Sequence, residues 1–503
     1  GRNERHMRII FCYPAWTGEY GLFGHFAKRN STWPPLSLAL LGAVCEQAGH
    51  EAIILDGEAD GLNREELAER AVALEPDIIG LTCYSPFFHL SADVAESVKK
   101  LNPNIPVMVG GPHITIMKEK SFLPQFDYAF MGEAERSLPA FLEAYRNFAG
   151  FPPGIIYRKR GKIINTGEAN WVTDISTKGR DVGQFYPLDE FPFPARHLLP
   201  MEKYLLGTLR GRKHFTSIQT FRGCPWRCQF CCSDKLNTTR VIMRSPKRVV
   251  EEMVEVRMKW PAITHFYIVD DVLTLWPKHV TEICDRINAE PLLKGKVTFE
   301  GSTRANLVND DLIKYLAETG LIRLSFGLET TDPKMRVTIQ KRVPMESYSA
   351  SNRICAKYGV EALNSLMIGL PGETRETIRT TIEWVRSQRD ISQANVAIAV
   401  PYPGTEFGDM AISGTHGVQL MDQDFARFLR YGNAVTRVGD MGPQELVEWQ
   451  NWAFVRIYSA PWRWLPVLRK HGIVGFLMQM LRVLRLWRRW LFRGWRPLGP
   501  VMR

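Results

Sequence analysis

The chain has 503 residues, of which 45% are hydrophobic and 23% are charged, and its formal net charge is +11. This length and composition exclude a wholly disordered, a collagen-like and a small disulfide-stapled protein, and they leave room for about two to four domains. The excess of positive charge lies entirely in residues 456–503, where eleven Lys and Arg occur without any Asp or Glu. The first 455 residues are therefore neutral as a whole, which argues against a general affinity of the protein surface for nucleic acid.

Residues 7–149 alternate short apolar strands with helical segments. The predicted strands are Ile9–Tyr13, Ala52–Leu55, Ile78–Thr82, Val107–Val109 and Tyr128–Met131. The predicted helices are Leu36–Ala48, Arg64–Leu74, Ser91–Leu101 and Arg136–Asn147. Because the strands are apolar throughout instead of alternating, they predict a parallel sheet covered on both faces, which is a Rossmann-like α/β domain. In such a sheet, ligands bind beyond the carboxyl ends of the strands.

Residues 150–213 interrupt this rhythm. They contain a predicted hairpin, with strands Ile155–Arg158 and Lys162–Asn165 on either side of Gly161, and then a Pro-rich stretch. We interpret the whole segment as a linker that contains a hairpin.

A second series of strands and helices fills residues 214–413. Its predicted strands are Thr216–Thr220, His265–Val269, Val297–Glu300, Arg323–Phe326, Ala362–Ile368 and Val396–Val400. Strands separated by helix-length segments in this way predict a partial (β/α)6 barrel whose active site lies at the carboxyl ends of its strands. Residues 414–503 are predicted to be a helical C-terminal region that ends in a basic amphipathic tail.

Cys224, Cys228 and Cys231 carry the clearest chemical signal in the sequence. Their Cys-x3-Cys-x2-Cys spacing places three thiols on one loop directly after the predicted strand Thr216–Thr220. Three such thiolates can each bind one iron of a [4Fe–4S] cluster and leave the fourth iron open. A structural zinc site is the alternative, but it takes four ligands in paired spacing, and no second pair follows here. The remaining cysteines are scattered, and an odd total of nine suits a reducing compartment better than a disulfide framework.

This loop resembles the signature of the radical S-adenosylmethionine (SAM) superfamily, which follows the first strand of a partial barrel. The resemblance implies that the open iron chelates the amino and carboxylate groups of SAM. It also implies that an electron, delivered by an external donor of the flavodoxin or ferredoxin type, cleaves SAM to a 5′-deoxyadenosyl radical. SAM contacts are implied for Phe230, Asp270, Asp271, Ser302, Arg304, Glu329 and Pro401. Arg304 suits the methionine carboxylate because a guanidinium binds two oxygens at once.

The first domain resembles the cobalamin-binding domain that precedes this barrel in one branch of the superfamily. The matching residues are Trp33, Pro34, Thr82, Ser85, Gly110, Gly111, Gly132 and Glu133. Gly110 and Gly111 would let the backbone approach the nucleotide tail of cobalamin closely. The sequence lacks the Asp-x-His-x-x-Gly motif that places a histidine below the cobalt in many such domains, so we expect no lower axial histidine. The alternative is a domain that keeps this fold without the cofactor.

Together, the two resemblances imply an enzyme that uses a [4Fe–4S] cluster, SAM and cobalamin to methylate an unactivated carbon. The cofactors carry this chemistry, and no catalytic side chain is singled out. One alternative is an oxidative cyclase of the anaerobic magnesium-protoporphyrin ester type. Another is a tRNA-modifying methylthiotransferase. Such enzymes carry a C-terminal β-barrel and three further cluster cysteines, a number that Cys12, Cys45 and Cys83 match here. A third is a metal-stabilised scaffold without enzymatic activity, which would not cleave SAM.

Residues 473–496 have the pattern of an amphipathic helix, with arginines opposite an apolar side. The apolar side comprises Ile473, Leu477, Met480, Leu484, Trp487 and Leu491. Such a helix predicts contact with an anionic membrane surface, and hence a cytoplasmic protein that is peripheral on the inner face of the cytoplasmic membrane. A hydrophobic substrate follows from it, such as an isoprenoid, a hopanoid-type lipid or a tetrapyrrole. A helix packed on the barrel is the alternative, and a nucleic-acid partner is not favoured because no aromatic stacking platform accompanies the tail.

Overall fold

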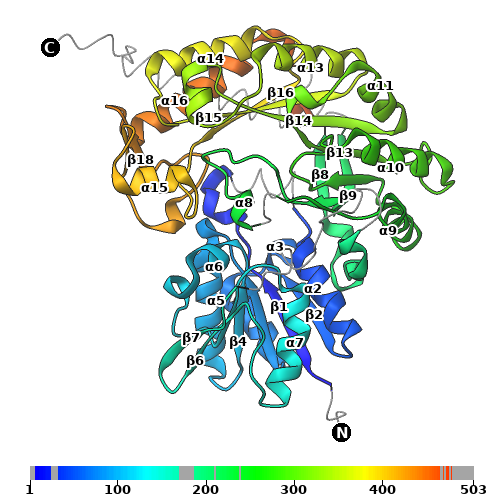
Figure 1. The fold of residues 1–503 in the computed structure, drawn as a ribbon, viewed down its shortest axis with the longest axis vertical. Helices are drawn as coiled ribbons and strands as arrows, with labels where there is room; N and C mark the ends of the chain where they lie inside the picture. Colours follow the sequence, from blue (N-terminus) through cyan, green and yellow to red (C-terminus); the bar gives the residue numbers. More distant parts are fainter. Residues whose placement is uncertain are drawn as a thin grey trace.

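The computed structural model describes residues 6–23, 32–168, 186–208, 211–236 and 240–464, together with 468, 472–474 and 477. Two seven-stranded sheets organise these residues into two α/β domains (Figure 1). The second sheet curves into an arch, with its helices on the outer side and the first domain below its open side (Figure 1). The prediction of an N-terminal Rossmann-like domain followed by a partial barrel is therefore confirmed.

The first sheet has the strand order β2-β1-β3-β4-β5-β6-β7. Its parallel strands are β1 (Arg8–Tyr13), β2 (Glu51–Asp56), β3 (Ile78–Thr82), β4 (Val107–Gly110) and β5 (Tyr128–Phe130). Both faces are buried, since Ile9 and Phe11 pack into one apolar core while Ile10 and Cys12 pack into another. Continuous apolar strands need cover on both faces, and this explains the position of the sheet between two helix layers.

Helices provide that cover. They are α2 (Leu36–Gln47) and α7 (Ala134–Arg146) on one face, and α4 (Arg64–Ala73) and α5 (Phe88–Leu101) on the other. Asn63 begins α4 with a capping box, because its side chain accepts from the N–H of Glu66 and the Glu66 carboxylate accepts from the N–H of Asn63. The shorter elements are η1 (Thr17–Phe23), α3 (Gly57–Asp60), η2 (Ser85–Phe87), α6 (Pro112–Met117) and η3 (Lys118–Ser121).

The hairpin that the sequence placed in a linker extends the first sheet instead. β6 (Ile155–Lys159) pairs antiparallel with β5, and β7 (Lys162–Asn165) forms the edge of the sheet. The reason is apolar burial, since Ile155 and Ile156 are fully buried and complete the two cores of the domain. The described part of the segment after the hairpin contains η4 (Pro187–Glu190), η5 (Arg196–Leu198) and η6 (Met201–Lys203).

The second sheet has the strand order β16-β15-β14-β13-β12-β9-β8. Its strands are β8 (Leu205–Thr208), β9 (Gly211–Ile218), β12 (His265–Ile268), β13 (Thr298–Thr303), β14 (Leu321–Glu329), β15 (Glu361–Ile368) and β16 (Gln393–Ile398). All run parallel from β9 to β16 and overlap the predicted strands, whereas β8 pairs antiparallel with β9 and was not predicted. Beside the sheet lie a short ribbon of β10 (Phe221–Arg222) with β11 (Ile242–Met243), and the single turn α8 (Ser233–Leu236).

The outer layer of the barrel consists of helices that bury the outward side chains of the strands. These helices are α9 (Pro246–Lys259), α10 (Pro277–Ala289), α11 (Asp310–Thr319), α12 (Pro333–Thr338), α13 (Met345–Lys357), α14 (Arg375–Ser387) and α15 (Glu406–Ser413), with η7 (Ala305–Leu307). Phe266 and Ile268 of β12, for example, lie in the same core as Val249 of α9 and Ile283 of α10. The alternate residues of the strands face the open side of the arch, where ligands of such barrels bind.

The region after the barrel departs from the helical prediction. β17 (Val418–Leu420) and β18 (Thr436–Val438) form an antiparallel pair, with η8 (Phe425–Arg427) between them. The helix α16 (Pro443–Tyr458) then packs on the barrel and buries Trp449, and η9 (Pro461–Arg463) follows. Strands of three residues are too short to leave a period in the sequence, which explains why they were missed.

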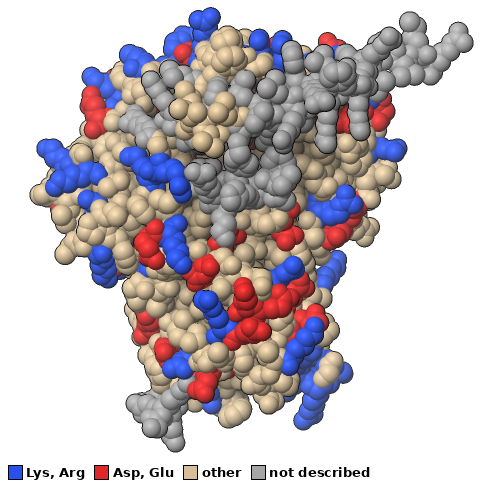
Figure 2. Space-filling model, turned by 180° about the vertical axis from the view of Figure 1, so that it is seen from behind, with Lys and Arg blue, Asp and Glu red and all other residues tan. Residues whose placement is uncertain are grey.

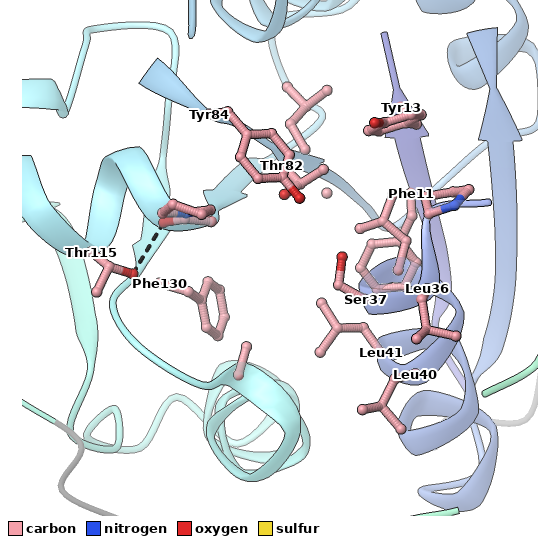
Figure 3. A pocket seen from close by; sticks show the side chains of 18 of the residues that line it. Phe11, Tyr13, Leu36, Ser37, Leu40, Leu41, Thr82, Tyr84, Thr115 and Phe130 are labelled. Atoms are coloured by element: carbon pink, nitrogen blue, oxygen red, sulfur yellow. Dashed lines mark hydrogen bonds between the residues drawn. The ribbon is translucent and has the colours of Figure 1, made fainter. Parts of the chain in front are cut away.

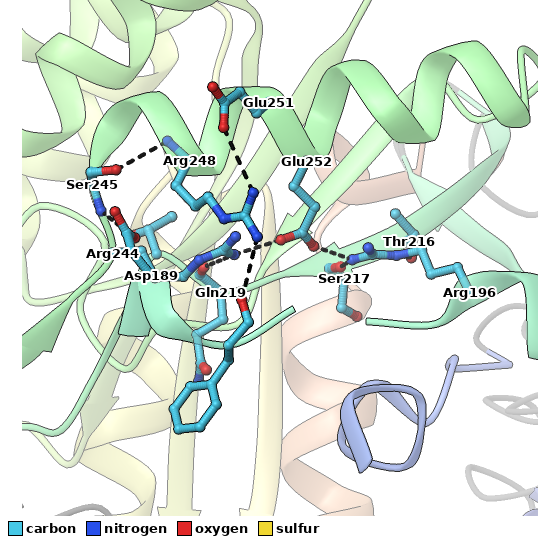
Figure 4. A network of polar contacts seen from close by, with 12 residues as sticks. Asp189, Arg196, Thr216, Ser217, Gln219, Arg244, Ser245, Arg248, Glu251 and Glu252 are labelled. Carbon is cyan, nitrogen blue, oxygen red and sulfur yellow. Dashed lines mark hydrogen bonds and ion pairs between the residues drawn. The ribbon is translucent and has the colours of Figure 1, made fainter. Parts of the chain in front are cut away.

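A buried charge network fixes the segment between the two sheets (Figure 4). The Arg196 side chain is 3% exposed and donates from Nη2 to Glu252 Oε1 at 2.6 Å, and Arg244 Nη1 lies 2.6 Å from the other Glu252 oxygen. Burial alone would raise the pKa of Glu252, but Arg244 and Arg196 together hold it below its usual range. Tyr204 donates from its hydroxyl to Asp56 Oδ2 at 2.7 Å, which ties this segment to the first domain.

Basic and acidic side chains lie side by side on the face shown in Figure 2, as expected for a body whose charges balance. Among the described residues, no helix has the length and hydropathy that a bilayer crossing requires. Residues 478–496, which make up most of the predicted amphipathic tail, lie outside the described residues, and the exposed Ile473, Val474 and Leu477 mark its beginning.

Candidate functional site

The three cysteines of the predicted motif lie on the loop that follows β9, at the carboxyl end of the barrel sheet. Gly223 turns the chain into this loop with a φ of 98°, a left-handed value that glycine adopts without strain. Cys224 and Cys228 are partly buried, Cys231 is exposed, and the N–H of Cys231 donates to the carbonyl of Cys228 at 2.9 Å. The motif therefore forms one compact loop at the end of the barrel where ligands are expected.

Two backbone hydrogen bonds pin this loop to the barrel. The N–H of Gln229 donates to the carbonyl of Ile339 at 3.2 Å, and the N–H of Phe407 donates to the carbonyl of Gln229 at 3.0 Å. Phe230, the aromatic residue of the motif, packs partly buried against the barrel core. The loop thus has a defined position between the ends of α12 and α15.

The cysteines fit the donor set of an iron–sulfur cluster. Burial raises the pKa of the partly buried Cys224 above its usual value, so its thiolate needs a strong positive charge beside it, which bound iron would supply. Among the described residues, no three acidic, His or Cys side chains converge tightly enough to hold a single metal ion. A four-iron cluster does not require such convergence, because each cysteine binds a different iron.

Arg304 lies beside the cysteine loop, at the end of β13. Its Nη1 is 3.9 Å from Cys228 Sγ, and its guanidinium carbon is 4.2 Å from the centre of the Trp226 ring. The Nε of Arg304 is buried and has no hydrogen-bond partner among the described residues. A buried donor without a partner is costly and indicates a site for an acceptor. The placement supports the predicted role of Arg304 in holding a carboxylate of SAM.

Glu329 ends β14 in an unusual conformation. Its φ is 63°, in the left-handed region, and its side chain is folded over Gly327, where a Cβ would collide with both Glu329 and Lys341. Lys341 Nζ lies 3.2 Å from Glu329 Oε1, and both side chains are nearly buried. Burial would lower the pKa of Lys341, but Glu329 and the nearby Cys228 raise it above its usual value. The sequence pointed to Glu329 and did not point to Lys341, because their pairing depends on the fold.

The structure gives Asp270 and Asp271 different environments. Asp270 is buried and accepts from the N–H of Thr220 at 2.7 Å, from the Thr220 hydroxyl and from the N–H of Phe221 at 3.2 Å. Both of its oxygens therefore help to hold the start of the cysteine loop, and its contact with SAM stays a prediction. Asp271 is exposed and accepts a hydrogen bond from the hydroxyl of Ser233 at 2.6 Å. Ser233 lies two residues after Cys231 in the chain.

The other two residues predicted to bind SAM lie near the carboxyl ends of β13 and β16. Ser302 of β13 accepts through its carbonyl from the N–H of Leu273 at 2.7 Å, and its side chain hydrogen-bonds to that of Tyr267. Pro401 is buried just after β16. Apart from Phe230, which lies on the cysteine loop after β9, the residues predicted to bind SAM lie at the carboxyl ends of β12, β13, β14 and β16.

A cavity of about 640 Å³ lies between the first domain and the barrel. From the first domain, its lining includes Thr82, Tyr84 and Phe130, which follow or end strands of the sheet and face a common space with Leu36, Leu40 and Leu41 of α2 (Figure 3). From the barrel side it includes Ser217, Gln219, Arg222 and Val269. One cavity therefore touches both the carboxyl ends of the first sheet and the start of the cysteine loop.

Most residues predicted to bind cobalamin line this cavity. They are Trp33, Pro34, Thr82, Gly110, Gly111, Gly132 and Glu133. Ser85 does not line it, and its hydroxyl lies 3.0 Å from Nδ1 of the buried His113 instead. Trp33 also packs edge-on against the rings of Phe215 and Tyr267, with centres 5.1 and 4.6 Å away, so it contacts the barrel as well.

At Gly111, no side chain covers the backbone of the cavity wall. Its φ is 106°, and a Cβ there would meet the carbonyl oxygen of Cys83 at 2.7 Å and Thr82 Oγ1 at 2.9 Å. Gly132, with a φ of 75°, donates from its N–H to Thr115 Oγ1 at 3.0 Å and makes a similar turn after β5. Bare backbone beside apolar side chains fits a large, mostly apolar cofactor with an amide-rich rim, as cobalamin is.

Glu133 has a protein partner that the sequence did not indicate. Arg222 Nη1 lies 3.0 Å from Glu133 Oε1, and Arg222 Nη2 donates to Glu135 Oε1 at 2.6 Å. Burial raises the pKa of Glu133, and Arg222 opposes that shift. Because Arg222 lies two residues before Cys224, these ion pairs join the first domain directly to the cysteine loop. We call Arg222, Glu133 and Glu135 the interdomain clamp.

Comparison with known proteins assigns both domains. Residues 25–142 match the B12 binding domain, and residues 218–385 match the radical SAM superfamily. The chain is 31% identical over 389 residues to an uncharacterised methyltransferase of Pyrococcus horikoshii, a match that covers 76% of this chain and 80% of the relative. It is 26% identical to the anaerobic magnesium-protoporphyrin IX monomethyl ester cyclase of Rubrivivax gelatinosus, over 84% of this chain and 73% of that protein. It is 27% identical to the hopanoid C-3 methylase of Methylococcus capsulatus, over 78% and 71%.

Two solved structures share the fold. The radical SAM methyltransferase TsrM from Kitasatospora setae, with cobalamin and a [4Fe–4S] cluster bound, superposes with a TM-score of 0.70 at 16% identity and covers 96% of this chain and 99% of its own. The cobalamin-dependent SAM radical enzyme OxsB superposes with a TM-score of 0.68 at 13% identity, over 90% of this chain and 66% of its own. From the two domain matches and the 31% identity, the chain belongs to the family of radical SAM enzymes with a B12-binding domain, whose cofactors are a [4Fe–4S] cluster, SAM and cobalamin.

Proposed function

We propose that this enzyme transfers a methyl group to an unactivated carbon of a small-molecule substrate. The observation that carries the proposal is the cavity between the domains, because its wall includes both the glycine turn after β4 and Arg222, two residues before the first cluster cysteine. A substrate in this cavity would lie within reach of both cofactor sites. The curated names of two relatives, a methyltransferase and a hopanoid methylase, support transfer of a methyl group.

The bound cofactors supply the chemistry that side chains lack: an electron to cleave SAM and a metal to carry its methyl group. The side chains bind and orient. Cys224, Cys228 and Cys231 would hold the cluster, and the unpartnered Nε of Arg304 is available for a carboxylate oxygen of SAM. Glu329 is held by Lys341 in a fixed position from which it would accept from an amino or hydroxyl group of SAM.

Apolar and aromatic side chains dominate the remaining walls of the cavity and would limit the access of water. They include Phe11, Met108, Leu138, Trp16, Tyr20 and Phe87. Such a lining protects a reactive radical from solvent and suits the apolar body of a substrate. It supports the proposed hydrophobic substrate class, which includes isoprenoids, hopanoid-type lipids and tetrapyrroles.

Three further parts of the proposal concern partners and location. A flavodoxin or ferredoxin type of protein would deliver the electron. Residues 473–496 would contact an anionic surface and make the protein peripheral on the inner face of the cytoplasmic membrane. Flotation with liposomes tests the membrane contact directly. Unchanged binding by a chain that ends at residue 470 would count against it.

The cyclase is the second candidate, since 26% identity to the Rubrivivax gelatinosus cyclase extends over 438 residues. The methylthiotransferase alternative is disfavoured by the placement of three cysteines. Cys12 and Cys83 lie in the core on one face of the first sheet, whereas Cys45 lies in the core on the other. Cysteines separated by a sheet are unable to bind one cluster together.

The deciding experiment measures what becomes of SAM. The full chain is reconstituted without oxygen with iron, sulfide and cobalamin, and is then given SAM, a reductant and candidate lipids or tetrapyrroles. Methyl transfer predicts equal amounts of S-adenosylhomocysteine and 5′-deoxyadenosine. 5′-Deoxyadenosine alone would contradict it and favour the cyclase. Cys228→Ala should abolish both products, while Cys232→Ala, one residue after the motif, serves as the matched control and should retain them.

A further inference from the structure

A positive charge without a counter-ion faces the cavity. Arg430 lines the cavity, and its side chain is accessible there. The cavity's other charged lining residues are Glu133, Glu135 and Arg222, which pair with one another in the interdomain clamp and together carry one net negative charge. Within the described residues, no carboxylate pairs with the guanidinium of Arg430. A guanidinium that faces the cavity without a carboxylate partner is available to an anionic ligand.

The backbone around Arg430 is fixed, so its side chain starts from a defined point. The carbonyl of Arg430 accepts from the N–H of Ile398 at 2.8 Å and from Gln450 Nε2 at 2.9 Å. Gln450 is a buried residue of α16, and its Oε1 also accepts from the N–H of Gly432 at 2.9 Å. These bonds attach the loop between η8 and β18 to the end of β16 and to α16. The position of Arg430 is therefore built into the barrel.

The ring of Tyr431 lies beside the guanidinium, and aromatic side chains of two further segments continue from that ring. The guanidinium carbon lies 6.0 Å from the ring centre of Tyr431, and that ring lies 6.5 Å from Tyr20 of η1. Tyr20 in turn contacts the rings of Trp16 and Phe87, at 6.2 and 6.3 Å. The arrangement provides a cation and flat apolar surfaces in one wall.

This wall lies on the side of the cavity where the chemistry would take place. Tyr402 follows β16, and its hydroxyl donates to the carbonyl of Phe428, two residues before Arg430, at 3.3 Å. The Arg430 wall therefore connects the cavity to the carboxyl ends of the barrel strands, where substrates of such barrels bind.

We propose that Arg430 binds an anionic group of the substrate, a carboxylate or a phosphoryl group, while Trp16, Tyr20, Phe87 and Tyr431 pack against an adjoining ring or chain. This rests on the proposed function, since it assumes that the substrate occupies the cavity. A guanidinium binds either anion through two parallel hydrogen bonds. The substrate would then be amphiphilic, with an acidic group at one end of a hydrophobic body, and a wholly neutral hydrocarbon would not be accepted.

The test measures binding separately from turnover. The full chain, loaded with cluster and cobalamin, is titrated with phenylacetate, phenylphosphonate and the neutral phenylacetamide, and binding is followed by ligand-observed NMR. We expect the anions to bind at least about tenfold more tightly than the amide, as charge-assisted hydrogen bonds predict. Arg430→Gln should remove this preference, and Arg430→Lys should keep part of it. Tighter binding of phenylphosphonate would assign a phosphoryl group, and tighter binding of phenylacetate a carboxylate.

Arg427→Gln is the matched control, because Arg427 lies in the same segment but pairs at the surface with Asp422 at 2.7 Å. It should retain the preference for anions. Equal binding of the acids and the amide, or a preference that survives Arg430→Gln, would overturn the inference. A loss of bound cobalamin in Arg430→Gln alone would also overturn it by assigning Arg430 to the cofactor. Failure of the proposed function has a separate readout: the unmodified enzyme, loaded with cluster and cobalamin, would not cleave SAM.

Discussion

Removing the cation of the interdomain clamp is expected to loosen the two domains from each other. Arg222 is 9% exposed and holds Glu133, which is 21% exposed, and Glu135, which is 12% exposed. Arg222→Met keeps the bulk of the side chain but leaves two carboxylates without a partner. Breaking a buried ion pair in this way costs about 3–5 kcal/mol, and the partial exposure of Glu133 places the expected loss near about 3 kcal/mol.

The assay combines denaturant unfolding of the cofactor-loaded chain with retention of cobalamin on gel filtration. Arg222→Met should lower the unfolding midpoint and release cobalamin, because Glu133 lines the cavity. The triple variant with Glu133→Gln and Glu135→Gln should recover most of the loss, since it no longer buries unpaired charge. Arg375→Met is the matched control: Arg375 also holds two carboxylates, Glu445 and Asp440, but nearer the surface, where such pairs contribute below about 1 kcal/mol. Equal effects of Arg222→Met and Arg375→Met would refute the reasoning.

Three further predictions follow from single positions. Gly111→Ala should abolish cobalamin retention, because its Cβ would meet the Cys83 carbonyl oxygen at 2.7 Å. Gly132→Ala should reduce retention less, because its Cβ would meet nothing within 4 Å, and the reverse order would count against a close approach of the backbone to cobalamin. Lys341→Met should release Glu329 and so reduce SAM cleavage at least about tenfold, with the iron content unchanged. Lys357→Met, which removes a surface ion pair with Asp310, should leave SAM cleavage unchanged. A loss of iron from Lys341→Met would instead assign Lys341 to cluster assembly. Burial raises the pKa of Glu373 from 4.5 to about 7. The stability that Glu373 contributes is therefore present below pH 4.5 and is lost, by about 3 kcal/mol, as the pH rises through about 7. In urea titrations, Glu373→Gln should flatten this fall in stability, and an unchanged pH profile would show that Glu373 does not cause the fall.

Periodic and local features were accessible from the sequence. The continuous apolar strands, such as Ile78–Thr82, predicted a covered parallel sheet because no other arrangement buries both of their faces. The cluster loop was accessible because its three cysteines lie within eight residues and depend on no distant partner. Gly110 and Gly111 were accessible for a similar reason, since a glycine pair after a strand predicts a tight turn by itself.

Pairings between distant residues were not accessible. Lys341 meets Glu329 twelve residues away in the chain, and Arg222 meets Glu135 at a separation of 87 residues. No periodic pattern encodes such a pair, because it exists only once the strands have set the positions of their loops. The same limit applies to the hydrogen bonds of Asp270 with Thr220, 50 residues away, which the sequence did not indicate.

Transfer of label from SAM tests the central claim most directly. The reconstituted enzyme is given SAM with a deuterated methyl group, together with acidic and neutral amphiphilic candidate substrates. The masses of the products are then measured by mass spectrometry. The account predicts a product that retains the intact deuterated methyl group on carbon and forms only from acidic candidates. Consumption of a substrate into a cyclised or oxidised product without deuterium would contradict methyl transfer.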